Sequence, residues 1–135
     1  MIETARLNTA FLDVAVAGDM AIPWSLPRLV GAGKARDPSL FPRRIHADEA
    51  LAIGLVSRVL SAQSFGDDVD ALVNTLLEKS PTALTGLNQN CVAAEQMPLR
   101  EFVQHEAKRH LQIAASEHTA EAFRAFVEKR KPNFT

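Results

Sequence analysis

Hydrophobic residues in the second half of the chain recur with the period of an α-helix. Val69, Leu72, Val73, Leu76 and Leu77 are separated by intervals that place them on one helix face. Acidic and polar residues fill the intervening positions and would face away from this apolar stripe. We therefore expect a helix through this segment, with its apolar stripe packed against another element.

Signals of helix initiation predict three more helices further along. Ser80 followed by Pro81 is typical of a helix start, because the serine hydroxyl accepts from a free N–H of the first turn and proline leaves none unpaired. Pro98 and the pair Ser116 and Glu117 are signals of the same kind. The predicted helices run over 81–95, 98–115 and 116–131.

The first sixty residues combine short strand and helix patterns. β-Branched and aromatic residues over 4–18 predict one or two short strands. Pro27 is expected to break a helix over 20–30, and later prolines restrict further helix to short pieces. A short helix over 48–53 and a strand over 55–60 follow. A short β-containing start before four or five helices is lopsided for a self-contained α/β domain.

Composition and charge exclude several classes of protein. With 135 residues and a net charge of -1, the chain has room for one domain at most and does not resemble a dedicated nucleic-acid binder. No apolar run reaches the roughly 18 residues of a membrane span, so we expect no membrane segment, no secretory signal and a cytoplasmic location. Cys91 is the only cysteine, which excludes an internal disulfide and a cysteine-based zinc site.

Basic residues gather in two segments despite the near-neutral total. Five bases against one acid give 28–46 a charge of +4, and four bases against one acid give 124–131 a charge of +3. Two such segments could contact one polyanionic ligand. The alternative is that both are ordinary solvated faces.

Asp19 is the acidic residue that the pattern singles out. It follows a glycine and precedes a predicted helix, so its carboxylate either caps backbone N–H groups or projects into a cleft as an acid/base group. Trp24, the only tryptophan, is either a core residue or part of a ligand pocket. Two Glu–His pairs at helical spacing could bind a metal, but such pairs are common on wet helix surfaces, so we predict no metal site.

Three ordered segments carry a family resemblance. GDMAIPWSLPRLVGAGKAR at 18–36, RRIHADEALAIGLVSRVL at 43–60 and AFVEKRKPNF at 125–134 resemble the crotonase family, also called the enoyl-CoA hydratase/isomerase superfamily. The resemblance implies the α/β crotonase-like fold, a β-β-α superhelix, of which this chain is the C-terminal part. Such a part is mostly α-helical with a few short strands. Residues 1–60 would end the spiral core, and 61–135 would form the C-terminal helical trimerisation region.

The same resemblance assigns roles to single residues. Asp19 matches a position where isomerase-like and dehalogenase-like branches place a working aspartate, and Trp24 would line the substrate pocket. Phe11 stands where hydratases carry their second glutamate, so a two-glutamate hydration mechanism is not expected. Phe126 and Lys129 match positions that reach a coenzyme A bound to the neighbouring subunit.

The resemblance also implies a substrate and an assembly. The substrate would be an acyl-CoA thioester of fatty-acid metabolism, with no permanently bound cofactor and no metal, and the assembly a homotrimer or hexamer. The oxyanion hole would belong to segments upstream of Met1, so we expect a truncated chain that is impaired or inactive alone. The alternatives are a non-catalytic helical assembly module, a partner for a separately encoded N-terminal half, or a gene product without function.

Overall fold

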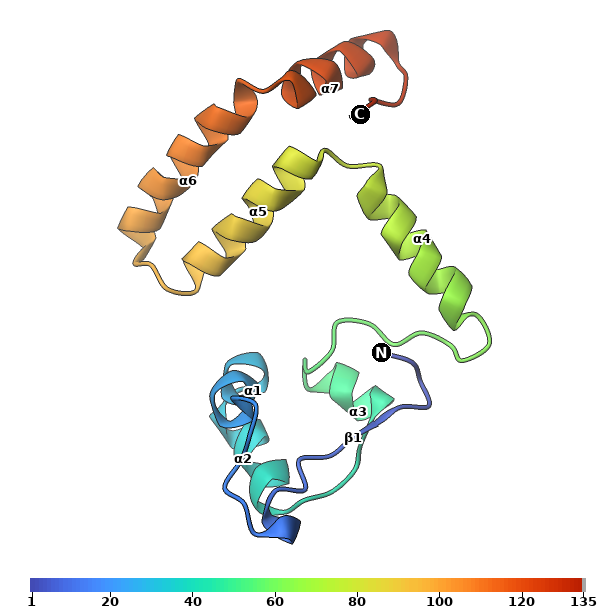
Figure 1. Cartoon of the computed structure of the whole chain (residues 1–135), viewed down its shortest axis with the longest axis vertical. Coiled ribbons are helices and arrows are strands. Elements are labelled where there is room, and N and C mark those ends of the chain that lie inside the picture. Colours follow the sequence, from blue (N-terminus) through green and yellow to red (C-terminus); the bar gives the residue numbers. More distant parts are fainter. Residues whose placement is uncertain (135) are drawn as a thin grey trace. The chain divides into compact units, whose positions relative to one another are not determined.

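A computed structural model of the chain describes residues 1–134 and shows a mainly helical protein with very short strands (Figure 1). The predicted abundance of helices over strands is thereby confirmed. The elements are β1 (Arg6–Leu7), η1 (Leu12–Val14), α1 (Ile22–Val30), α2 (Ala32–Leu40), β2 (Ile45–His46), α3 (Ala47–Ala52), α4 (Phe65–Leu77), α5 (Pro81–Ala94), α6 (Leu99–Ala114) and α7 (Glu117–Glu128).

The chain divides into two compact units. The first unit is Met1–Val69, and the second begins at Asp70, so that α4 spans the boundary. The predicted assignment of 1–60 to the end of a spiral and of 61–135 to a trimerisation region stays a prediction.

The first unit has a small core between two adjacent helices. Leu26 and Val30 of α1 and Ala35 of α2 are buried against one another, with partly buried hydrophobic side chains packed around them. Near this pair, β1 and β2 form an antiparallel ladder in which Leu7 lies opposite Ile45. The core of this unit is therefore small and centred on the contact between α1 and α2.

Prolines interrupt α1 and α2 less than expected. Pro27 lies inside α1 and Pro38 inside α2, and each helix continues past its proline. Each proline removes one backbone hydrogen bond, but the neighbouring bonds form, such as Gly31 N–H to the Pro27 carbonyl at 2.9 Å and Phe41 N–H to the Asp37 carbonyl at 2.9 Å. The prediction of a helix broken at Pro27 was therefore wrong, whereas the next helix is restricted to the nine residues of α2.

The predicted strand over 55–60 is not formed. Only Leu60 makes a bridge, parallel to Ile2, in which the Glu3 N–H donates to the Leu60 carbonyl at 2.9 Å. A strand needs a partner along its length, and within residues 1–134 Leu60 is the only residue of this segment that is paired. The predicted short helix before it is confirmed as α3, and Gly54 follows with φ +79°.

Helix starts in the second unit lie where the sequence places them. The Ser80 hydroxyl accepts from the Ala83 N–H at the start of α5, and the Ser116 hydroxyl accepts from the Thr119 N–H at the start of α7. Helices α5 and α6 then pack side by side (Figure 1). Gly86 of α5 is buried at this contact.

Candidate functional site

Asp19 lies in a tight turn directly before α1. One carboxylate oxygen accepts from the Met20 N–H at 2.6 Å, and among residues 1–134 the carboxylate has no other partner. Ala21, rather than Asp19, occupies the N-cap position of α1, and its side chain makes no capping bond. The Asp19 carboxylate is therefore exposed, oriented by one backbone N–H, and not used in capping the helix.

The turn around Asp19 has an unusual backbone. Met20 and Ala21 both have left-handed conformations, with φ of 52° and 57°. Such conformations cost an L residue about 1–2 kcal/mol, since Cβ crowds the carbonyl oxygen. Gly18 has φ +121°, and a Cβ there would lie 2.6 Å from Cγ of Pro23. The position thus requires glycine, which lets the turn that carries Asp19 approach Pro23 closely.

Trp24 lies on an exposed face of α1. Its side chain is 59% exposed, and the Arg28 guanidinium stacks over the ring at 3.8 Å from the centroid. The same guanidinium donates to the Trp24 carbonyl at 2.7 Å, so Arg28 contacts both the ring and the backbone of Trp24. The role of Trp24 in a substrate pocket stays a prediction.

An apolar cavity of about 410 Å³ lies within the first unit, between η1, α1 and α2. Phe11 lines it together with Pro23 and Pro27, while Arg36 and Ser39 supply polar groups. No carboxylate is among its lining residues. Phe11, which occupies the position of a hydratase glutamate in the resemblance, is therefore part of an apolar wall.

Phe126 and Lys129 lie together at the C-terminal end of α7. The Phe126 side chain is 81% exposed. Lys129 ends the helix in a left-handed conformation, with φ 54°. The Arg130 N–H donates to the Ala125 carbonyl at 3.0 Å and the Lys129 N–H to the Phe126 carbonyl at 3.3 Å, which is the Schellman pattern of helix termination. The Lys129 side chain is exposed and has no partner among residues 1–134.

Glu121 holds the segment that follows this turn. Its carboxylate accepts from both terminal nitrogens of Arg130, at 2.5 and 3.1 Å, and from the Asn133 N–H at 2.9 Å. The bond from Arg130, reinforced by the Asn133 N–H, lowers the pKa of Glu121 to about 2. A two-pronged arginine–carboxylate contact also fixes the orientation of the Arg130 side chain, which constrains the backbone of the adjacent Lys129.

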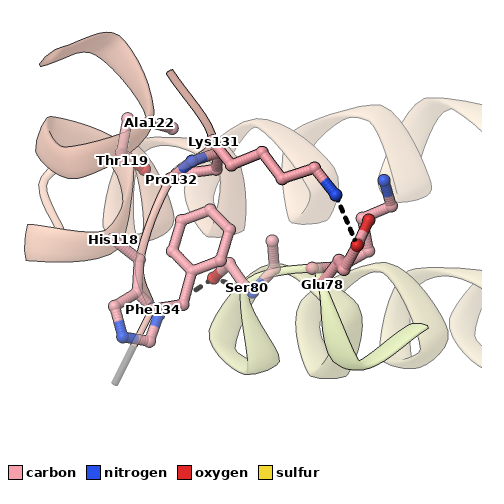
Figure 2. Close-up of a pocket in the computed structure, with 10 residues that line it drawn as sticks. Glu78, Ser80, His118, Thr119, Ala122, Lys131, Pro132 and Phe134 are labelled. Atoms are coloured by element: carbon pink, nitrogen blue, oxygen red, sulfur yellow. Dashed lines mark hydrogen bonds and ion pairs between the residues drawn. The ribbon is translucent and has the colours of Figure 1, made fainter. Parts of the chain in front are cut away.

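Two further contacts hold the same segment: Glu78 with Lys131, and His118 with Phe134. Together with the contact between Glu121 and Arg130, we call them the tail clamp. Lys131 donates to Glu78 at 2.7 Å, which lowers the pKa of that carboxyl. The Phe134 ring lies 5.5 Å from the His118 ring, centroid to centroid (Figure 2). The clamp borders a cavity of about 520 Å³ in the second unit.

The Ser80 hydroxyl forms a hydrogen bond with Nδ1 of His118 at 2.9 Å (Figure 2). The same hydroxyl accepts from the Ala83 N–H, so the serine joins the start of α5 to α7. Sequence reasoning predicted the helix start at Ser80 but missed its partner, because the two residues are 38 positions apart and no local spacing connects them.

Other candidates from the sequence show no assembled site. Among residues 1–134 no three histidine, cysteine, aspartate or glutamate side chains converge where a metal ion could bind. Cys91 is an exposed free thiol. Over the same described part of the chain, no helix has the length and apolar character needed to cross a membrane.

Comparison with known proteins identifies the family. The family model described as "Enoyl-CoA hydratase/isomerase" matches residues 1–135. The chain belongs to this family. A peroxisomal Delta(3,5)-Delta(2,4)-dienoyl-CoA isomerase of Arabidopsis thaliana is 30% identical over 98% of the chain and 48% of its own length. A carnitinyl-CoA dehydratase of Citrobacter koseri is 32% identical over 79% of the chain and 42% of its own length.

Solved structures of the family give the same extent. The enoyl-CoA hydratase of Bacillus anthracis aligns with a TM-score of 0.93 and 26% identity, over 98% of the chain and 52% of that structure. An enoyl-CoA hydratase subunit I of Geobacillus kaustophilus aligns with a TM-score of 0.90 and 29% identity, over 99% and 53%. The crotonase-like fold is therefore confirmed, and the chain spans about half the length of the relatives that it matches.

Proposed function

We propose that this chain is part of an enzyme that acts on acyl-CoA thioesters, and that Phe126 and Lys129 contact the coenzyme A moiety. Membership of the enoyl-CoA hydratase/isomerase family supports this substrate class. Two relatives have names that specify dienoyl-CoA and carnitinyl-CoA. We place the reaction in fatty-acid metabolism and in the cytoplasm.

The conformation of Lys129 is the observation that carries the proposal. Glycine is the usual residue at a left-handed helix end, because it has no Cβ to crowd the backbone. A lysine in this conformation destabilises the fold by about 1–2 kcal/mol. Within residues 1–134 its side chain makes no contact that would offset this cost. A strained residue with an unused cation indicates a binding role outside the chain's own packing. The phosphates of coenzyme A are a matching anion.

Phe126 offers a complementary contact. Its ring is exposed close to the Lys129 turn, where an aromatic face can stack against a planar group such as adenine. In the proposed assembly, a homotrimer or hexamer, both residues would reach a ligand held by a neighbouring copy of the chain. The exposed position of both side chains supports a contact made between copies.

We assign proton transfer beside the thioester carbonyl to Asp19. Its carboxylate has one oxygen held by the Met20 N–H, and the rest of the group is available to a substrate proton. Phe11 lines the apolar cavity at the position where the resemblance expects a hydratase glutamate, so this position has no carboxylate to activate a water, which favours proton transfer over hydration. Isomerisation of an enoyl-CoA is therefore the proposed reaction class.

Calorimetric titration with hexanoyl-CoA tests the binding role. Wild-type chain should bind saturably, and Lys129→Ala should weaken binding by about tenfold, as expected for the loss of one charge-assisted contact. Lys108→Ala, which removes an exposed lysine of α6, is the matched control and should change the affinity by less than about twofold. Equal affinities for wild type and Lys129→Ala would refute the assignment.

A helical assembly module is the second candidate function. Apolar side chains on α6 and α7 are exposed, including Leu99, Leu111, Phe123 and Phe126, which are 77%, 70%, 69% and 81% exposed. Exposed apolar surface of this kind marks protein–protein contacts. Sedimentation equilibrium tests this role: a chain that stays monomeric at all concentrations contradicts it.

A further inference from the structure

Carboxylates outside the turn hold the segment that follows Lys129, and Glu121 makes more of these contacts than Glu78 does. Glu121 lies two helical turns before the end of α7 and takes three hydrogen bonds from residues that follow Lys129, two from Arg130 and one from Asn133. The turn is thus tied on one side by the helix and on the other by Glu121, while Arg130 also pairs with Glu128 and Lys131 with Glu78. Its Schellman hydrogen bonds alone leave the chain after Arg130 free to move away.

We propose that Glu121 is a positioning residue for coenzyme A recognition, acting through Arg130 to hold the Lys129 turn in its binding conformation. This inference rests on the proposed function, in which Lys129 contacts coenzyme A. Glu121 does not touch the ligand in this arrangement. It fixes the backbone from which the Lys129 ammonium projects, so that the ordering is complete before the ligand binds.

The sign of the effect separates positioning from plain electrostatics. Replacing Glu121 by glutamine removes a negative charge near a cationic turn, and long-range electrostatics alone would then strengthen binding of an anion such as coenzyme A. Positioning predicts the opposite, because glutamine cannot form the charged two-pronged contact with Arg130. The two explanations therefore predict opposite changes in affinity.

The experiment is a double-mutant cycle on the full chain with hexanoyl-CoA as the probe. Glu121→Gln should weaken binding by about 3- to 10-fold, the amount that ordering a long side chain contributes. In a Lys129→Ala background the same change should alter the affinity by less than about twofold, since no ammonium remains to be positioned. Glu117→Gln, which removes an equal charge from the first turn of α7, is the matched control and should not weaken binding.

A second probe separates positioning from general loss of structure. Hexanoyl-pantetheine carries the thioester but none of the phosphates, so its affinity should be equal for Glu121→Gln and wild type. A variant that is merely unfolded or loosened would lose both probes.

Each outcome gives a decision. Weakening by Glu121→Gln that disappears in Lys129→Ala supports the inference. If Lys129→Ala weakens binding while Glu121→Gln leaves it unchanged or strengthens it, the positioning role is overturned and the proposed function stands. If Lys129→Ala has no effect, both are overturned, because Glu121 has no contact to position.

Discussion

Gly86 is predicted to be coupled to Ile113 across the contact between α5 and α6. A Cβ added at Gly86 would lie 2.3 Å from Cδ1 of Ile113, far inside van der Waals contact. Its next neighbours, Cδ of Arg109 and Cγ1 of Ile113, would lie at 3.5 and 3.6 Å, which are ordinary contacts. The single terminal methyl of Ile113 is therefore the obstacle to a side chain at position 86.

The magnitude follows from two opposing effects. Alanine is favoured over glycine inside a helix by about 1 kcal/mol. Overpacking at a helix contact costs about 1–3 kcal/mol, because Ile113 must leave its rotamer or the helices must move apart. Gly86→Ala should therefore lower the free energy of unfolding by up to about 2 kcal/mol.

Removing the obstructing methyl should reverse the sign. Ile113→Val deletes Cδ1 at a cost of about 0.5–1.5 kcal/mol. In that background, Gly86→Ala meets only ordinary contacts and should stabilise the protein by about 1 kcal/mol. The two substitutions should thus show a favourable interaction energy of about 1–3 kcal/mol.

Urea unfolding followed by helical circular dichroism measures all four members of this cycle. Gly66→Ala on α4 is the control, because a Cβ there meets nothing within 4 Å. Its effect should be the same with isoleucine or valine at position 113. Additivity of Gly86→Ala and Ile113→Val within about 0.5 kcal/mol would refute the predicted contact.

Lys129→Gly should separate binding from stability, since it relieves the left-handed turn and removes the cation: the urea midpoint should not fall, while calorimetry shows the same loss of hexanoyl-CoA affinity as Lys129→Ala. Gly18→Ala should lower the free energy of unfolding by about 1–3 kcal/mol, and a change under about 0.5 kcal/mol would contradict the close approach to Pro23. Asp19→Asn should bind hexanoyl-CoA within about twofold of wild type and lose deuterium exchange at the carbon beside the thioester, measured by mass spectrometry; retained exchange would exclude Asp19 as the base. Because the pKa of Glu121 is about 2 in the folded protein against an ordinary 4.5, its contribution to stability is complete above pH 4.5 and is lost as the pH falls towards 2. Glu121→Gln should flatten the acid side of the plot of unfolding free energy against pH, and an unchanged slope would contradict the clamp.

Helices were predictable here because their signals are local. Ser80 and Ser116 cap α5 and α7 through N–H groups three residues away, and both helices begin where the sequence indicated. The strand expected over 55–60 failed for the opposite reason. The segment needed a partner strand along its length, and among its residues only Leu60 is paired, with Ile2. Strand formation depended on a pairing that the local pattern does not contain.

The candidate site was likewise only partly predictable from the sequence. Phe126 and Lys129 could be identified because they lie in a short contiguous motif that resembles a family. The clamp on Glu121 could not, because it depends on Lys129 adopting a left-handed conformation that sends Arg130 back along the helix. A lysine gives no warning of such a turn, whereas a glycine would have suggested one. The pairing of His118 with Phe134 follows from the same reversal.

The tail clamp also makes protease cleavage after α7 a measure of whether the clamp is closed. Lys129 and Arg130 are successive trypsin sites, whereas Pro132 blocks cleavage after Lys131. The Arg130 side chain is held by Glu121, and the neighbouring Lys131 side chain is held by Glu78. To cleave after Arg130, a protease must extract this side chain from Glu121 and extend the backbone around it, which the closed clamp prevents. The rate of tryptic cleavage after Arg130 should therefore report the fraction of molecules in which the clamp is open. A cation that competes for Glu121 or Glu78 would therefore increase the cleavage rate before the helices unfold.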